Sequence, residues 1–162
     1  MLELVIYVAV LAIVSLVIAS MFVTINRGQG QVEVRAEVNS NSRFAIEKIS
    51  QDLRAASAVT TPATAGATAS NLVMTIAGST IEYCLAANQL RRQVNGTCNA
   101  SSETISSNRV IVNTPTFVRL ENTNTVLAKT VVSVAVNLTV TSLDTTGEKI
   151  FSVNKKTAIS IK

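Results

Sequence analysis

The stretch that decides the fold is "LVIYVAVLAIVSLVIASMFVTI", residues 4–25, an apolar run without a charged side chain. As an α-helix with a rise of ~1.5 Å per residue it would be ~33 Å long, enough to cross the hydrocarbon core of a membrane. A secretory signal peptide would have a basic start, a shorter apolar core and a small-residue cleavage site, and none of these is evident. We therefore expect residues 1–25 to form a hydrophobic transmembrane helix, with Glu3 as a carboxylate at its start.

The distribution of basic residues conflicts with the orientation that we expect for this helix. No Lys or Arg precedes the apolar run, whereas Arg27, Arg35, Arg43 and Lys48 follow it. The positive-inside rule would then place the bulk of the chain in the cytoplasm. The Thr-, Ser- and Asn-rich composition and the two cysteines favour an extracellular domain instead. A basic leader that once preceded Met1 and has been removed would resolve the conflict.

An amphipathic segment, residues 26–58, continues directly from the apolar run. Gly28 and Gly30 lie near its start and each weakens a helix by up to ~1 kcal/mol, so they predict either a break or a softened segment. One long helix over residues 2–58, softened there and ended by Pro62, is the expectation. Its core-packing stripe, at helical spacings of three and four, consists of Ile46, Ile49, Leu53 and Ala56. The other face carries Glu47, Lys48, Gln51, Asp52 and Arg54, and we expect Asp52 and Arg54 to be surface charges.

From residue 71 onward the hydrophobic period changes from 3.6 to 2, which predicts strands. "NLVMTI" and "STIEYCL" flank a plausible hairpin turn at Ala77-Gly78, and "VVSVAVNLTVTSL" alternates as a half-buried antiparallel strand does. Further strands are expected at "NQLRRQV", "RVIVN", "TFVRL" and after a turn at "DTTGE", residues 144–148. The predicted fold class is α+β, with a long N-terminal helix covering the antiparallel β-sheet of a globular domain, residues 59–162.

The cysteine and histidine counts limit the chemistry that this chain can perform. Cys84 and Cys98 are the two cysteines, and no histidine exists to complete a zinc site. In an exported protein the pair predicts one disulfide, worth ~3 kcal/mol for a loop of about 15 residues; two free thiols in a cytosolic protein are the alternative. No nucleotide-binding glycine loop or paired acid/base carboxylate is evident, so we expect no enzyme activity, no metal and no cofactor.

The net charge of +4 comes from 14 basic and 10 acidic residues that are scattered along the chain. The densest basic pairs are Arg91-Arg92 and Lys155-Lys156, and neighbouring residues on a strand point to opposite faces. We therefore interpret these pairs as solvated strand ends. DNA or another anionic surface is an open partner that no focused patch supports.

Two stretches resemble the type IV pilin superfamily, which includes pilins and the pseudopilins of type II secretion and competence systems. "LELVIYVAVLAIVSLVIASMF" is similar to the family's hydrophobic N-terminal segment with its single glutamate, and "SRFAIEKISQDLRAAS", residues 42–57, is similar to the helix that follows it, especially in the minor-pilin and pseudopilin branch. "IEYCLAANQLRRQV" resembles a sheet hairpin of that branch. The chain departs from the family in lacking a proline within the hydrophobic helix and the aromatic residue usual at the methylated mature terminus.

The resemblance implies a filament subunit, stored in the cytoplasmic membrane and then polymerised into an extracellular pilus. The implied partners are identical subunits, the membrane before assembly, the pilus assembly machinery and the prepilin peptidase. The resemblance also implies a role for Glu3 and Met1 in assembly register, because the carboxylate would pair with the N-terminal amine of a neighbouring subunit. The filament would serve motility, adhesion, DNA uptake or secretion.

Two alternatives stay open from the sequence. One is a minor pilin or pseudopilin of a type II secretion or competence system. The other is a single-pass membrane-anchored β-domain that never polymerises, in which Glu3 would lie at the lipid headgroups. A mere tether would more often show a flexible linker after the membrane, and the segment around Gly28 and Gly30 is the feature that could provide one.

Overall fold

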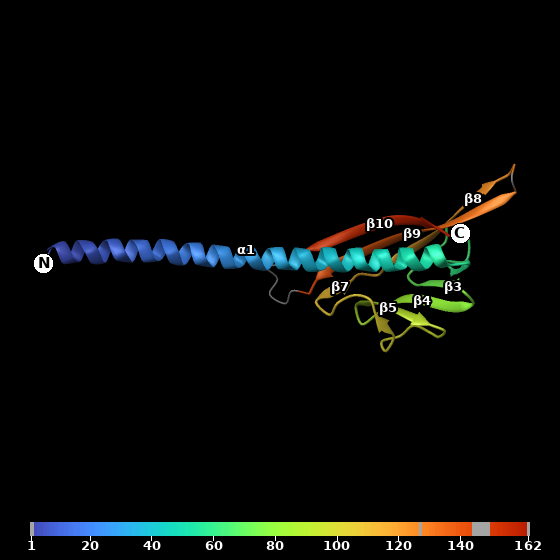
Figure 1. The fold of residues 1–162 in the computed structure, drawn as a ribbon, viewed down its shortest axis with the longest axis horizontal. Coiled ribbons are helices and arrows are strands. Elements are labelled where there is room, and N and C mark those ends of the chain that lie inside the picture. Colours follow the sequence, from blue (N-terminus) through green and yellow to red (C-terminus); the bar gives the residue numbers. More distant parts are fainter. Residues whose placement is uncertain (1, 127, 144–149, 162) are drawn as a thin grey trace.

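The computed structural model describes residues 2–126, 128–143 and 150–161, so the turn that we expected at residues 144–148 lies outside the described residues. One helix, α1 (Leu2–Ala55), accounts for 54 residues and is ~80 Å long at the standard rise. Its first half extends alone, while the strands gather along its second half (Figure 1). The predicted α+β architecture, a long N-terminal helix packed on antiparallel sheet, is confirmed.

The helix ends at Ala55, three residues earlier than predicted, and Pro62 is not what ends it. The backbone N–H of Ala56 donates to the Leu53 carbonyl at 3.2 Å, and that of Ser57 already donates across to Thr75 at 2.9 Å. Ala58 then begins a strand that pairs with the residues around Thr75. Hydrogen bonding to a neighbouring strand therefore replaces the last helical turn that we expected.

The strands form two antiparallel sheets rather than the single sheet that we expected. The first sheet has the order β1 (Ala58–Thr61), β3 (Leu72–Ile76), β4 (Ser79–Ala86), β5 (Gln89–Val94) and β6 (Glu103–Thr104). The second has the order β10 (Ser152–Ser160), β9 (Lys129–Ser142), β8 (Thr116–Asn124) and β2 (Thr68–Ala69), with β7 (Val110–Val112) also paired to β9. The three strands that the sequence did not predict, β1, β2 and β6, are short.

The predicted hairpin turn at Ala77-Gly78 is confirmed. Ile76 pairs with Ser79, so two residues connect β3 to β4. Both turn residues have positive φ, 49° and 83°, as in the two-residue turns whose twist matches that of the flanking strands. Glycine adopts this conformation without steric cost.

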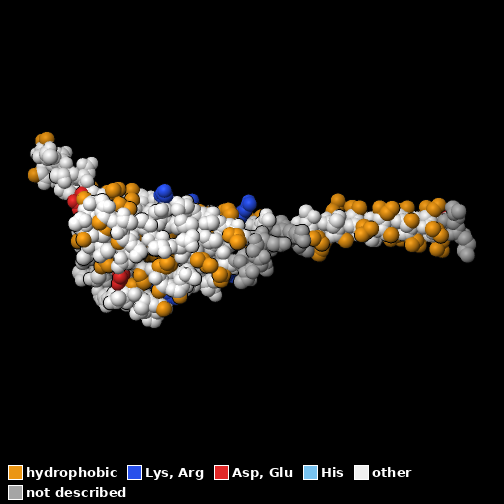
Figure 2. All heavy atoms as spheres, turned by 180° about the vertical axis from the view of Figure 1, so that it is seen from behind, with side chains coloured by type: hydrophobic (Ala, Val, Ile, Leu, Met, Phe, Trp, Pro, Cys, Tyr) orange, Lys and Arg blue, Asp and Glu red, His pale blue; other side chains and the backbone are white. Residues whose placement is uncertain are grey.

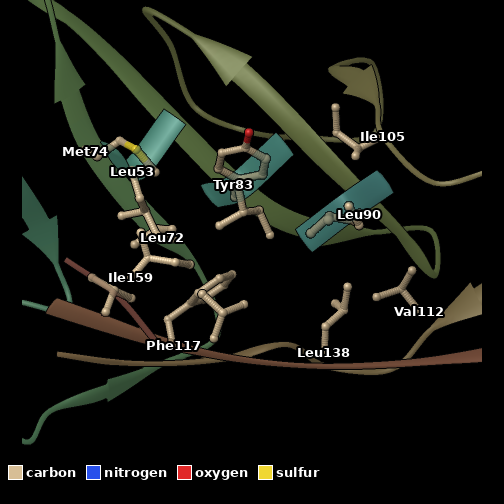
Figure 3. Packing of buried hydrophobic residues seen from close by; sticks show 14 of the residues in the cluster. Leu53, Leu72, Met74, Tyr83, Leu90, Ile105, Val112, Phe117, Leu138 and Ile159 are labelled. Carbon is tan, nitrogen blue, oxygen red and sulfur yellow. The ribbon is translucent and has the colours of Figure 1, made fainter. Parts of the chain in front are cut away.

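The hydrophobic core lies between the two sheets and the second half of α1 (Figure 3). Leu72 and Tyr83 from the first sheet and Phe117 and Leu138 from the second are completely buried. On β9 the alternation that we predicted is confirmed, because Val134, Val136, Leu138 and Val140 are all buried. The sheets thus form the platform on which half of the helix is fixed.

Candidate functional site

The first half of α1 is an apolar surface that no other part of the described chain covers. Its large apolar side chains, from Leu4 to Ile25, are each 49–71% exposed. Its most apolar stretch, 18 residues long, has a mean hydropathy of 2.8, and none of this stretch is buried. Figure 2 shows this half as a rod with apolar side chains along it, projecting from a body of mixed surface. By length and composition α1 is therefore a candidate membrane-spanning helix.

The polar side chains within this half have different surroundings. The hydroxyl of Ser20 donates to the Val17 carbonyl at 2.8 Å, and that of Thr24 donates to the Ser20 carbonyl at 2.9 Å. These two hydroxyls are satisfied by their own helix, so they cost little in an apolar environment. Glu3 is exposed in the first turn and has no hydrogen bond or ion pair with any other described residue. Met1 lies outside the described residues. The pairing of Glu3 with the N-terminal amine of a neighbouring subunit therefore stays a prediction.

The connection between the two halves is helical. α1 runs through Gly28 and Gly30 without interruption, so of our two expectations for this segment the break is wrong. Softening of the helix there stays a prediction. The apolar rod and the domain are therefore joined by continuous helix rather than by a loop.

The stripe that we predicted on the second half packs as expected, with one difference in position. Ile49, Leu53 and Ala56 are buried, whereas Ile46 is only partly buried against the core. The buried line continues toward the first half through residues that the stripe did not include: Val38, Ser42 and Ala45. A core helix face that includes Ala45 is rotated slightly away from Ile46, which explains the difference.

Asp52 is not a surface charge, which corrects our expectation. It is 7% exposed, and one of its oxygens, Oδ2, accepts hydrogen bonds from the Tyr83 hydroxyl at 2.7 Å and from Arg92 Nε at 2.8 Å. Tyr83 and Arg92 are direct cross-strand neighbours on β4 and β5. The network of Asp52, Tyr83 and Arg92 therefore fixes the helix to the first sheet through charged and buried groups. Arg54, by contrast, is exposed as predicted.

The electrostatic effects within this network follow from its burial. The pKa of the Tyr83 phenol is raised far above its usual range. Burial is the largest cause, and the hydrogen bond and charge of Asp52 add to it. Burial opposes the charge of Arg92, but the hydrogen bond and charge of Asp52 outweigh it and raise the pKa of Arg92. The tyrosine is therefore neutral and the arginine charged across the whole physiological range. Arg92 also contacts Glu103 at 3.5 Å, at the solvent-facing side of the network.

The two basic pairs differ from each other. Arg91 and Arg92 are not solvated strand ends, because Arg92 binds Asp52 and Arg91 donates to the carbonyl of Ser102 at 2.8 Å. Lys155 and Lys156 are exposed as expected, but they lie in the middle of β10 rather than at a strand end. Both border a groove beside Arg43 and Glu47 of α1, although strand alternation sends their side chains to opposite faces.

Further contacts hold α1 from its middle to its end. The side-chain oxygen of Asn41 accepts from the Ser107 N–H at 2.7 Å, and its amide donates to Glu37 at 2.9 Å. Arg35 lies over the ring of Phe151, 5.5 Å from its centre. Together with the Asp52 network, these contacts attach the helix to the first sheet, to the loop before β7 and to the residue before β10, and they restrain rotation of the rod relative to the domain.

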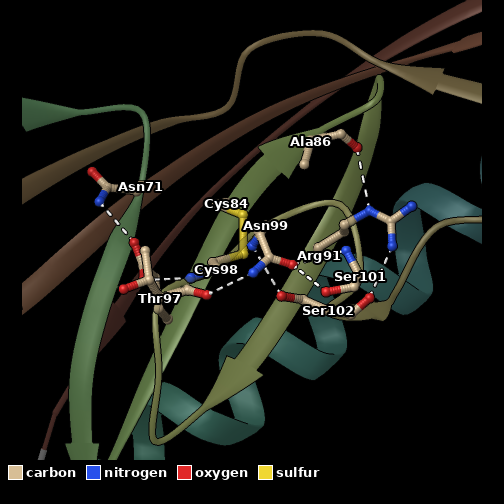
Figure 4. Close-up of a disulfide and its surroundings, with 10 residues drawn as sticks. Asn71, Cys84, Ala86, Arg91, Thr97, Cys98, Asn99, Ser101 and Ser102 are labelled. Atoms are coloured by element: carbon tan, nitrogen blue, oxygen red, sulfur yellow. Dashed lines mark hydrogen bonds between the residues drawn. A yellow bond between two sulfur atoms is a disulfide. The ribbon is translucent and has the colours of Figure 1, made fainter.

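The predicted disulfide between Cys84 and Cys98 is present, with Cα atoms 6.0 Å apart (Figure 4). It links β4 to the loop that follows β5. Glu82 accepts a hydrogen bond from the Cys98 N–H at 2.9 Å and another from Asn71 at 3.1 Å. The disulfide and this carboxylate together tie the loop after β5 to β4 and to the residue that precedes β3. A disulfide is consistent with an exported domain.

The sequence contained a signal for the Asp52 network that our prediction of a surface charge did not use. Asp52 comes three residues after Ile49 and four before Ala56, a spacing that places it on the buried face of the helix. Tyr83 lies two residues after Ile81 on β4, and Arg92 lies two residues after Leu90 on β5. Residues two apart on a strand share a face, so the spacing places all three polar groups on the faces that carry core residues.

No metal site is evident in the described ranges, because no three His, Cys, Asp or Glu side chains come together there. Comparison of the chain with known proteins finds no relative: no family model, no curated protein and no solved structure matches it. The candidate functional site is therefore defined by the chain itself. It is the exposed apolar half of α1, with Glu3 at its tip and a domain fixed to its other half.

Proposed function

We propose that the chain is a structural subunit of a type IV pilus-like extracellular filament, stored in a membrane and polymerised through the first half of α1. The observation that carries this proposal is the apolar rod, which leaves the domain as uninterrupted helix with no cover from the described chain. The extracellular domain would be the part from β1 to β10, outside the membrane before assembly and on the filament surface afterward.

The size of the exposed surface requires a partner. Burying one large aliphatic or aromatic side chain is worth ~1.5–3 kcal/mol, so covering the run from Leu4 to Ile25 is worth tens of kcal/mol. Lipid can provide this cover, and so can the same helix of neighbouring copies. A subunit that exchanges one cover for the other would leave the membrane at little net cost, which suits a filament assembled from a membrane store.

The rigid attachment of the domain favours assembly over simple tethering. A tether gains nothing from a defined angle between its anchor and its domain. Here Asn41, Arg35 and the Asp52 network fix that angle through contacts with three separate segments of the domain. In a helical filament every domain must have the same position relative to its core helix, and these contacts provide it.

Glu3 would specify the register of assembly. An unpaired carboxylate at the centre of a bilayer costs at least ~2.5–3.5 kcal/mol, and a similar penalty applies in a dry helical core. Pairing with the N-terminal amine of a neighbour would offset that cost only at one axial position. A buried ion pair adds little net stability but can select one arrangement over others.

The test is isolation of surface filaments from the producing cells, with electron microscopy and mass spectrometry of their subunit and its N-terminus. We expect the filaments to contain this chain. We further expect Glu3→Ala to lower filament yield at least tenfold at unchanged membrane levels. Glu47→Ala, which removes an exposed carboxylate paired with Arg43 on the same helix, is the matched control and should leave the yield unchanged.

The outcomes separate the alternatives. If the chain is found in the membrane fraction alone and no filament contains it, the proposal is wrong and the non-polymerising anchored β-domain is the better description. If the filaments contain it only as a trace component, it is a minor pilin or a pseudopilin. If Glu3→Ala filaments assemble at the wild-type yield, the register role is wrong while the filament proposal stands.

A further inference from the structure

Three stretches of the chain match the acceptor pattern for N-linked glycans, Asn-x-Ser/Thr with x other than proline. They begin at Asn95, Asn99 and Asn137. In a chain this rich in Asn, Thr and Ser such matches arise by chance, so their positions in the fold must distinguish a real acceptor from a coincidence. The fold separates them clearly, because the first two share one exposed loop and the third lies inside a sheet.

The pattern at Asn137 is not accessible in the folded domain. Asn137 lies within β9 and pairs with Thr116 of β8 on one side and Lys156 of β10 on the other. Its side-chain oxygen accepts a hydrogen bond from Asn154 at 2.8 Å, and Leu138, the middle residue of the pattern, is completely buried. An enzyme that must bind all three residues of the pattern cannot do so without opening the sheet.

The other two patterns lie in the loop between β5 and β6, which we call the acceptor loop, residues 95–101, "NGTCNAS". Six of its seven residues are exposed, and Cys98 is half-buried. The loop contains no charged and no large apolar side chain, so it leaves space for a bulky sugar. Its disulfide is typical of the oxidising, exported side of a membrane. Figure 1 shows β4 and β5 away from the first half of α1, so a glycan here would not obstruct the apolar rod.

The two asparagines of the acceptor loop differ in how they are held. The side-chain oxygen of Asn95 accepts from the Thr80 N–H at 3.0 Å, and its own N–H donates to the Thr80 carbonyl at 2.8 Å. Asn95 therefore extends the pairing of β5 with β4. The side chain of Asn99 bonds only within the loop (Figure 4): Oδ1 accepts from the N–H and hydroxyl of Ser101 at 2.8 and 2.6 Å, and Nδ2 donates to the Thr97 carbonyl at 3.4 Å. An enzyme can bind the Asn99 side chain without breaking a side-chain contact to the sheet.

We propose that Asn99 carries an N-linked glycan, transferred from a lipid-linked sugar phosphate on the exported side of the membrane. In this reaction Nδ2 attacks C1 of the first sugar and loses one proton, while the bond from C1 to the phosphate oxygen breaks and the lipid phosphate leaves with the electron pair. A carboxamide nitrogen is a weak nucleophile because its electron pair is delocalised toward Oδ1. The Ser101 hydroxyl donates to Oδ1 and stabilises the charge that this oxygen takes up as the proton leaves. The proposal needs an exported domain but does not need a filament.

The direct experiment is mass spectrometry of the full chain isolated from the membrane and surface fractions of the producing cells. Trypsin cleaves after Arg92 and Arg109 and leaves residues 93–109 as one peptide that contains both loop asparagines. After reduction we expect its mass to be increased by a whole number of sugar residues. Fragmentation by electron transfer, which preserves the bond to the sugar, should locate the addition on Asn99. The peptide that contains Asn137 should have its unmodified mass.

Variants of the two hydroxyl residues test the assignment to Asn99. Ser101→Ala should abolish the modification, whereas Ser101→Thr, which preserves the pattern, should retain it. Thr97→Ala is the matched control, because Thr97 is exposed on the same loop and its loss destroys only the pattern that begins at Asn95. It should leave the glycan in place. An intact disulfide between Cys84 and Cys98 shows that each variant has folded.

The outcomes distinguish this inference from the proposed function. An unmodified 93–109 peptide in every fraction overturns the glycan, and filaments that contain such a chain leave the filament proposal intact. A sugar on Asn95 or on a hydroxyl, with none on Asn99, also overturns it, as does a glycan that persists in Ser101→Ala. A glycosylated chain that occurs in the membrane but in no filament supports the glycan and overturns the filament.

Discussion

The two halves of α1 belong to one uninterrupted helix but obtain their stability from different sources. In the first half each large apolar side chain is 49–71% exposed, whereas in the second half Val38, Ile49 and Leu53 are fully buried against the sheets. The second half also carries the Asp52 network, which makes its attachment specific. Helical continuity therefore does not imply a common environment: the second half is stabilised by its own chain, whereas the first half has no cover from the described chain.

The strongest way to break this comparison is to remove the attachment of the second half. Asp52→Ala leaves the Tyr83 hydroxyl and the Arg92 guanidinium without their shared acceptor in a site where Asp52 and Arg92 side chains are only 10% and 15% exposed. We expect the free energy of unfolding to fall by roughly 2–4 kcal/mol. Chemical unfolding of the full chain in detergent micelles, followed by circular dichroism of the strands, measures this change.

Arg54→Ala is the matched control for Asp52→Ala, because Arg54 lies two residues further along the same helix and is exposed. We expect it to change the unfolding free energy by less than about 0.5 kcal/mol. A loss below about 1 kcal/mol for Asp52→Ala would mean that apolar packing alone fixes the helix, and the contrast between a specific and a non-specific attachment would disappear.

The position of Asp52 also shows where prediction from the sequence succeeded and where it failed. The apolar run, the stripe around Ile49 and Leu53 and the alternation on β9 each repeat a single period, so local pattern was sufficient to predict them. The network was missed because its three members lie on three different elements, and a charged residue was assigned to solvent by type rather than by helical position. The division into two sheets depends on pairings between distant segments, such as β2 with β8, which no local pattern contains.

A smaller effect that sharpens the comparison is the pH dependence of Tyr83. In the unfolded chain its phenol ionises near pH ~10, whereas in the fold burial and Asp52 raise its pKa far above that range. The stability that it contributes is complete below pH ~10 and decreases as the pH rises further, by about 1.4 kcal/mol per pH unit. We therefore expect the difference in unfolding free energy between wild type and Tyr83→Phe to shrink with that slope above pH ~10.

Unfolding of both proteins in micelles between pH 8 and about pH 11.5 measures this slope. Tyr7→Phe is the control, because Tyr7 is the other tyrosine of the chain and lies in the exposed half of α1. It should leave the slope of the wild type unchanged. A difference between wild type and Tyr83→Phe that stays constant over this range would show that the phenol is not shielded by its network.

The smallest expected effect on the domain concerns the first half of α1. Leu11→Ala removes a side chain that is 66% exposed, so unfolding of the domain should change by less than about 0.5 kcal/mol. The same substitution at Leu53, which is fully buried, should cost roughly 2–5 kcal/mol and calibrates the measurement. In the filament that we propose, Leu11 would be buried between neighbouring rods, so Leu11→Ala should reduce filament yield although it leaves the stability of the domain unchanged. If Leu11→Ala instead destabilises the isolated domain by more than 1 kcal/mol, the first half contributes to the fold of its own chain, and the division of α1 into an internally and an externally stabilised half is wrong.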